Sequence, residues 1–120
     1  MFLVLGALLG AAAVVLGAFG AHALKGRLAA DAMAVYRTAV EYHFYHAIGL
    51  ALIGAVAMRL PDSAVLASAG WAMLAGVVLF SGSLYVLAVT GVRWLGAVTP
   101  VGGLAFIMAW LLFAWAAWRS

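Results

Sequence analysis

The chain has 120 residues, of which 70% are apolar before its 14 glycines are counted, and it carries only six basic and three acidic side chains. A soluble domain of this length needs a polar surface, because most of its residues touch water. The composition therefore excludes a soluble enzyme, a disordered chain and a nucleic-acid-binding module, and it leaves an integral membrane protein whose partner is the lipid bilayer. The absence of cysteine excludes disulfides and thiolate metal sites.

The intervals between charged residues predict an all-α membrane domain with four transmembrane helices. A spanning helix needs about 20 mostly apolar residues. The interval from 42 to 58 is short, so its helix must begin near Ala39 and include Glu41. The preceding residues, 28–38, either extend this helix outward or lie on the membrane surface. The expected spans lie near 2–21, 39–58, 66–89 and 99–118.

Two helix starts carry local signals. The first apolar stretch lacks a basic segment before it and exceeds the about 7–15 apolar residues of a signal peptide, which favours a retained helix. The last helix has Thr99 as a predicted N-cap, with Pro100 at its first position. The alternative is a proline kink inside a longer helix that starts near Trp94.

The first helix has one smooth face and one bulky face. Helices in lipid associate by close packing of small residues, since water does not drive them together. We therefore expect a compact four-helix bundle in which this helix packs through its small face. We also expect Gly10→Leu or Gly17→Leu to damage folding more than Leu8→Ala. The small face comprises Gly6, Gly10, Ala13, Gly17, Gly20 and Ala21, and the opposite face Leu8, Val15 and Phe19.

Three polar residues at helical spacing, Arg37, Glu41 and Tyr45, share one face of the second helix. A carboxylate inside a membrane segment is costly unless it finds a cation or takes up a proton. We interpret these residues as a structural polar cluster at the inner membrane edge, with Glu41 within about 4 Å of a basic nitrogen. The alternatives are a proton-carrying or substrate-handling Glu41, and contact with lipid headgroups.

The three histidines are His22, His43 and His46. The spacing of His43 and His46, with His22 at the end of the first helix, could provide nitrogen ligands for a metal or haem. The simpler interpretation is hydrogen-bonded histidines at the membrane interface, and no cofactor is predicted. Ser81 has no nearby base along the chain, which argues against a nucleophilic serine.

Four ordered motifs resemble a known family. The set resembles domain-of-unknown-function family 423, which comprises YgdD-like bacterial inner-membrane proteins and the related transmembrane protein 256 of animals. The resemblance covers essentially the whole chain and implies a small multi-helix membrane protein, without supplying an activity or site residues. The motifs are Gly17-Ala18-Phe19-Gly20-Ala21-His22-Ala23-Leu24, Tyr36-Arg37-Thr38-Ala39 with Tyr42-His43-Phe44-Tyr45-His46-Ala47, Phe80-Ser81-Gly82-Ser83-Leu84-Tyr85, and Thr99-Pro100-Val101-Gly102-Gly103.

Three functions remain open from the sequence. The leading interpretation is a non-enzymatic structural or accessory component of the membrane, either a homo-oligomer or part of a larger membrane complex. The alternative is a small oligomeric transporter or channel that uses Glu41 and the histidines. The third is a metal- or haem-binding membrane protein.

The basic residues predict the orientation in a bacterial inner membrane. The more basic loops of a membrane protein face the cytoplasm. One side has Lys25, Arg27, Arg37 and Arg93, whereas the other has Arg59 and Arg119. Both termini should therefore lie outside the cytoplasm. A reporter that works only outside the cytoplasm should therefore be active when it is fused after Ser120. A reporter signal from the cytoplasm would instead show the opposite orientation.

Overall fold

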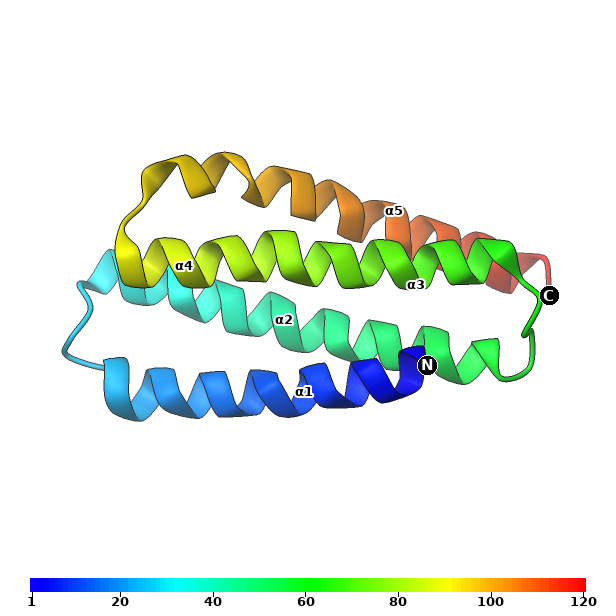
Figure 1. The fold of residues 1–120 in the computed structure, drawn as a ribbon, viewed down its shortest axis with the longest axis horizontal. Coiled ribbons are helices and arrows are strands. Elements are labelled where there is room, and N and C mark those ends of the chain that lie inside the picture. The colour runs from blue at the N-terminus through cyan, green and yellow to red at the C-terminus, as the bar shows by residue number, and fades with distance from the viewer.

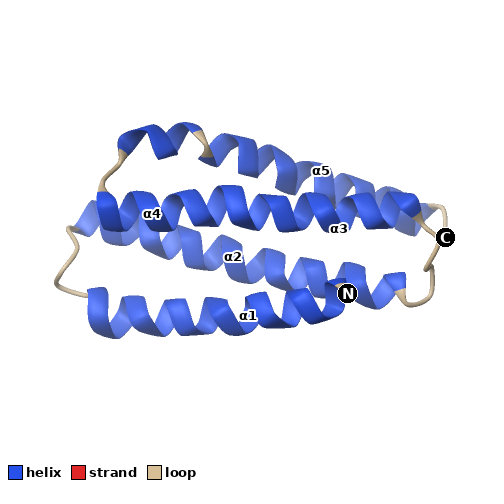
Figure 2. Ribbon diagram, in the orientation of Figure 1, coloured by secondary structure: helices blue, strands red, loops and turns tan.

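A computed structural model describes residues 1–120, and all of its regular structure is helical (Figure 2). Four helical segments run up and down, so that both termini lie at the same end (Figure 1). Of 99 backbone hydrogen bonds, 84 lie within the helices, as lipid requires of a spanning chain. The segments are Phe2–Leu24 (α1, Phe2–Phe19, and the π-helix η1, Gly20–Leu24), Ala30–Ala57 (α2), Ala64–Thr90 (α3, Ala64–Gly76; the π-helix η2, Val77–Ser81; α4, Gly82–Thr90) and Arg93–Trp118 (the 3-10 helix η3, Arg93–Ala97; α5, Thr99–Trp118).

The second helix, α2, begins at Ala30, nine residues before its expected start. The uncharged interval 42–58 indicates only which residues can lie in the hydrocarbon of the membrane. The helix itself continues beyond that interval into the polar region, where charges are tolerated. Its 28 residues span about 42 Å at the standard rise, longer than the about 30 Å hydrocarbon core. Glu41, His43 and His46 therefore lie near the middle of α2 and not at its edge.

The start of α5 differs from the N-cap prediction for Thr99. Thr99 is the first residue of α5 and makes no capping hydrogen bond; its hydroxyl instead donates to the carbonyl of Leu95 at 3.3 Å. The helical segment already begins at Arg93, as a 3-10 turn, so the structure is closer to the alternative of a longer helix. A cap was predicted because Thr99 precedes Pro100, but a preceding helical turn leaves no free end to cap.

Helix α2 occupies the centre of the bundle. It packs against α1 on one side and against α3, η2 and α4 on the other, while α5 packs against α3 and η2 (Figure 1). Four large side chains are essentially inaccessible at these contacts: Leu50, Ile53, Leu66 and Met73.

The contact between α1 and α2 depends on glycines. A Cβ atom on Gly6 would collide with the backbone of Ala51, and one on Gly54 would collide with the backbone of Leu3. A Cβ on Gly20 would collide with the ring of Tyr36. The two backbones therefore approach closely, as expected from the small face.

The small face has two exceptions, Gly10 and the exposed Ala21. Nothing lies within 4 Å of where a Cβ of Gly10 would be, so the structure shows no close helix contact to support the expectation that Gly10→Leu disrupts packing. The helical wheel gives the direction of a side chain but not the separation of the two helices at that height. The opposite face is confirmed as outward-facing, because Leu8, Val15 and Phe19 are each at least half exposed.

Replacing a close-contact glycine should cost more stability than replacing an open one. Gly54→Ala should destabilise the bundle by about 1–3 kcal/mol, the usual cost of overpacking, because backbone cannot move aside easily. Gly10→Ala and Gly82→Ala, which meet open space, should be neutral or stabilising. Thermal unfolding in detergent measures the difference, and equal losses in all three variants would contradict the close contact.

Candidate functional site

Buried polar side chains connect the helices inside the bundle. His43 on α2 is only 4% exposed, and its Nδ1 lies 2.8 Å from the hydroxyl of Tyr85 on α4. Its Nε2 is buried without a hydrogen-bond partner, although the backbone of Leu9 on α1 lies beside the ring. His43 thus lies where three helices meet.

His46 is held one turn further along α2. Its Nδ1–H donates to the carbonyl of Tyr42 at 2.6 Å, within the same helix. Its ring stacks on Phe106 of α5, with centroids 3.4 Å apart and planes 12° apart. His46 is therefore a packed interior residue. His43 and His46 are both hydrogen-bonded, as expected, but they lie between helices because α4 and α5 pack on that side of α2.

Hydroxyl groups make the remaining contacts between helices. Ser81 is fully buried at the end of η2, and its hydroxyl donates to the Ala39 carbonyl of α2 at 2.8 Å. Ser83 lies 2.7 Å from the hydroxyl of Thr99, which joins α4 to α5. A π-helical turn shifts side chains relative to a regular α-helix and often occurs where a helix must present a particular group.

Tyr36 on α2 connects this helix to the first helical segment. Its hydroxyl donates to the Leu16 carbonyl, and its ring lies over Gly20. It also meets Tyr85 edge-on, with ring centroids 5.4 Å apart. No sequence pattern marks Tyr36 as a site residue, although the sequences around Tyr36 and Gly20 form two of the family motifs.

The three histidines do not come together. His22 is exposed in η1, whereas His43 and His46 point into the bundle and bind Tyr85 and the Tyr42 carbonyl. No group of three histidine, aspartate or glutamate side chains is placed to hold a metal ion. The geometry therefore gives no support to the three-histidine site considered from the sequence.

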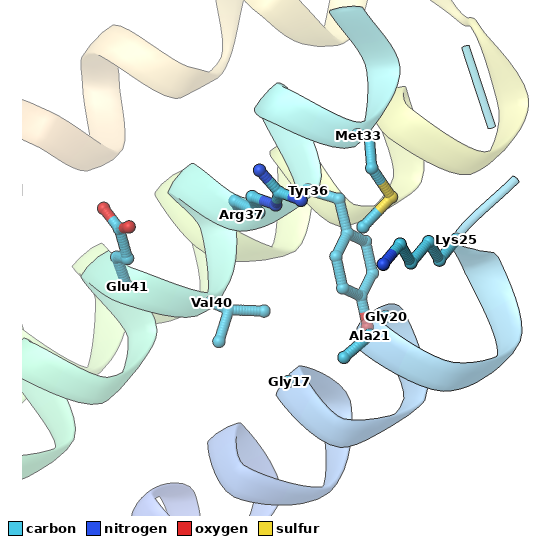
Figure 3. Close-up of a pocket in the computed structure, with 9 residues that line it drawn as sticks. All are labelled: Gly17, Gly20, Ala21, Lys25, Met33, Tyr36, Arg37, Val40 and Glu41. Atoms are coloured by element: carbon cyan, nitrogen blue, oxygen red, sulfur yellow. The ribbon is translucent and has the colours of Figure 1, made fainter. Parts of the chain in front are cut away.

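Arg37, Glu41 and Tyr45 share a face of α2 as predicted, but that face points outward and all three residues are exposed. Figure 3 shows the guanidinium of Arg37 and the carboxylate of Glu41 extending separately, and the predicted ion pair is not formed. Their i,i+4 spacing permits the pair, but nothing packs over these side chains to hold them together.

A groove between α1 and α2 runs beneath these charges (Figure 3). Its polar end has a volume of about 330 Å³, and Lys25, Arg37 and Glu41 are its charged lining residues. It continues into an apolar section of about 560 Å³ beside Phe44 and Tyr45. Both sections share Gly17, Ala21, Val40 and Glu41.

Comparison with known proteins identifies relatives along the whole chain. Residues 16–103 match the family described as protein of unknown function (DUF423). The UPF0382 membrane protein YwdK of Bacillus subtilis is 49% identical over 98% of this chain and 95% of its own length. A UPF0382 membrane protein of Staphylococcus haemolyticus is 49% identical over 93% of this chain and 90% of its own length. No solved structure matches the chain significantly.

The pairing of His43 with Tyr85 should be measurable as a coupling free energy. His43→Phe, Tyr85→Phe and the double variant form a cycle, and we expect a coupling of about 0.6 kcal/mol and at most about 1.7, the range for polar pairs between membrane helices. Unfolding in detergent or bicelles provides the values. Tyr45→Phe, at an exposed position, serves as the control, and zero coupling in the cycle would show that the 2.8 Å contact is not stabilising.

Proposed function

The chain belongs to the DUF423 family of membrane proteins, and from this premise we propose that it is a non-enzymatic accessory component of the membrane that works through the lateral surface of α1 and α2. The protein is a multi-pass membrane protein, with four helices long and apolar enough to span a bilayer. The proposal concerns which part of its surface is used.

The observation that carries the proposal is the outward position of the charges near the groove. Glu41 lies within the apolar part of α2 expected to span the membrane, with Arg37 one turn nearer the outer end, and both are exposed on the outer side of α2. Charged groups in a membrane segment are costly and usually face protein, water or a binding partner. A partner that covers this groove in the membrane would relieve that cost.

The polar side chains inside the bundle also support this proposal. His46, Ser81 and Ser83 are each hydrogen-bonded within the fold. The hydroxyl of Ser81 donates to a backbone carbonyl and not to a base, as a serine nucleophile would require. These polar side chains therefore stabilise the bundle, which leaves the groove as the candidate binding surface.

A transporter is the second candidate, favoured by the exposed carboxylate of Glu41 within a spanning helix. A path through a single copy would need Glu41 and the histidines on one side, but Glu41 faces outward whereas His43 and His46 face inward. Such a path would have to form between copies. A metal- or haem-binding protein has no comparable support.

Site-specific photocrosslinking in native membranes tests the lateral surface. A photoreactive residue at Ala18, in the groove, should give one reproducible adduct, either a lipid species or a protein, because a bound partner excludes the bulk lipid. The matched control is Val86, which is exposed on α4, outside the groove and a similar number of residues from the same end of the bundle. Identical bulk-lipid adducts at both positions would refute the proposed surface.

A further inference from the structure

We propose that the groove between α1 and α2 binds one anionic phospholipid, with its phosphate at Lys25 and Arg37 and an acyl chain along the small residues of α1. This proposal rests on the proposed function and names the chemical class of the partner. Three observations support the proposal: the charges at the polar end of the groove, the apolar path below them, and the like charges that a second copy of the chain would bring.

The polar end of the groove suits a phosphate group. Lys25 extends from the end of η1, and Arg37 extends from α2, on either side of Tyr36 (Figure 3). Lysine and arginine side chains in membrane proteins extend towards the headgroup region, where phosphate oxygens accept their hydrogen bonds. Two cations therefore line the same end of the groove, where we place the phosphate.

Glu41 is the one acidic group that lines this end of the groove. It lies four residues beyond Arg37, about 6 Å deeper at the standard helical rise. A guanidinium has five N–H donors, so Arg37 could bind a phosphate above it and the Glu41 carboxylate below it at once. The polar end of the groove thus has two positive charges and one negative charge, and Arg37 would serve as the partner of Glu41.

The groove below the charges is apolar and open. Its middle section is bordered by Val14 and Ala18 on α1 and by Phe44 on α2. A further section of about 330 Å³ follows between Gly10 on α1 and Ile48 on α2. The missing side chain of Gly10 leaves space that no other part of the bundle fills, as a bound hydrocarbon chain would require.

The groove suits a lipid better than a second copy of the chain. Two parallel copies joined face to face through this surface would bring Lys25 and Arg37 of each copy towards the same cations of the other. An anionic lipid brings the opposite charge. The basic end also lies in the more basic half of the protein, which is predicted to face the cytoplasm, where anionic lipids attract basic residues.

Lipid binding to the full chain in detergent tests the phosphate site. Native mass spectrometry and thermal unfolding, with added phosphatidylglycerol or phosphatidylcholine, should show one tightly bound phosphatidylglycerol and a larger stabilisation by it. Lys25→Gln and Arg37→Gln should each weaken its binding by about tenfold, the loss expected for one charged hydrogen bond. Arg93→Gln, at the same end but outside the groove, is the matched control and should bind normally.

A second pair of variants tests the acyl path. Gly10→Leu should fold normally, since its side chain enters open space, but should reduce phosphatidylglycerol binding several-fold by filling that space. Val15→Leu, on the opposite face of α1, should not. If Gly10→Leu fails to fold, the exposed Ala18→Phe replaces it. Glycerol phosphate, which has no acyl chain, should not compete with the lipid.

Three results would overturn the proposal: equal binding of the two lipids, equal effects of Lys25→Gln and Arg93→Gln, or complete competition by glycerol phosphate. A protein adduct at Ala18, including one with a second copy of the chain, would also overturn it while leaving the proposed lateral surface intact. Identical bulk-lipid adducts at Ala18 and Val86 would instead refute the lateral surface, so the two failures are distinguishable.

Discussion

The near-contact of two backbones, those of α1 and α2, is the interaction on which the arrangement of the first half of the protein depends. Lipid offers helices no hydrophobic gain on association, so α1 must be held by dispersion contacts that require short distances. Gly6 and Gly54 supply those distances by omitting side chains. α1 otherwise remains largely uncovered, and the groove forms where the same small residues no longer meet a neighbour.

Helix α2 has three sides, and each makes different contacts. One side receives the glycines of α1, and a second directs His43 and His46 towards α4 and α5. The third carries Arg37 and Glu41 outward. Neutral polar groups that can pair within the bundle lie inside, whereas charged groups, whose desolvation costs far more, remain at the surface.

The sequence predicted the class of fold, the number of spans and the outward face of Leu8, Val15 and Phe19, because these follow from apolar length and helical phase alone. It did not predict the fate of Gly10 or the missing Arg37–Glu41 ion pair. Both depend on how far the neighbouring helix is and on which side it lies, and a single helical wheel contains neither quantity. The inward position of His43 and His46 depends on α4 and α5 packing beside α2, and the sequence of α2 alone does not contain that information.

The π-helical turn at Val77–Ser81 has a consequence for chain length. A π-turn accommodates one more residue than a regular α-helical turn, while the flanking helices keep their facing directions. A homologue one residue shorter at this point could therefore retain Met73 in the core on one side and Ala88 on the other. What it would lose is the local displacement that brings Ser81 to the carbonyl of Ala39. A length difference there would mark the loss of one helix-to-helix hydrogen bond, with no change of topology.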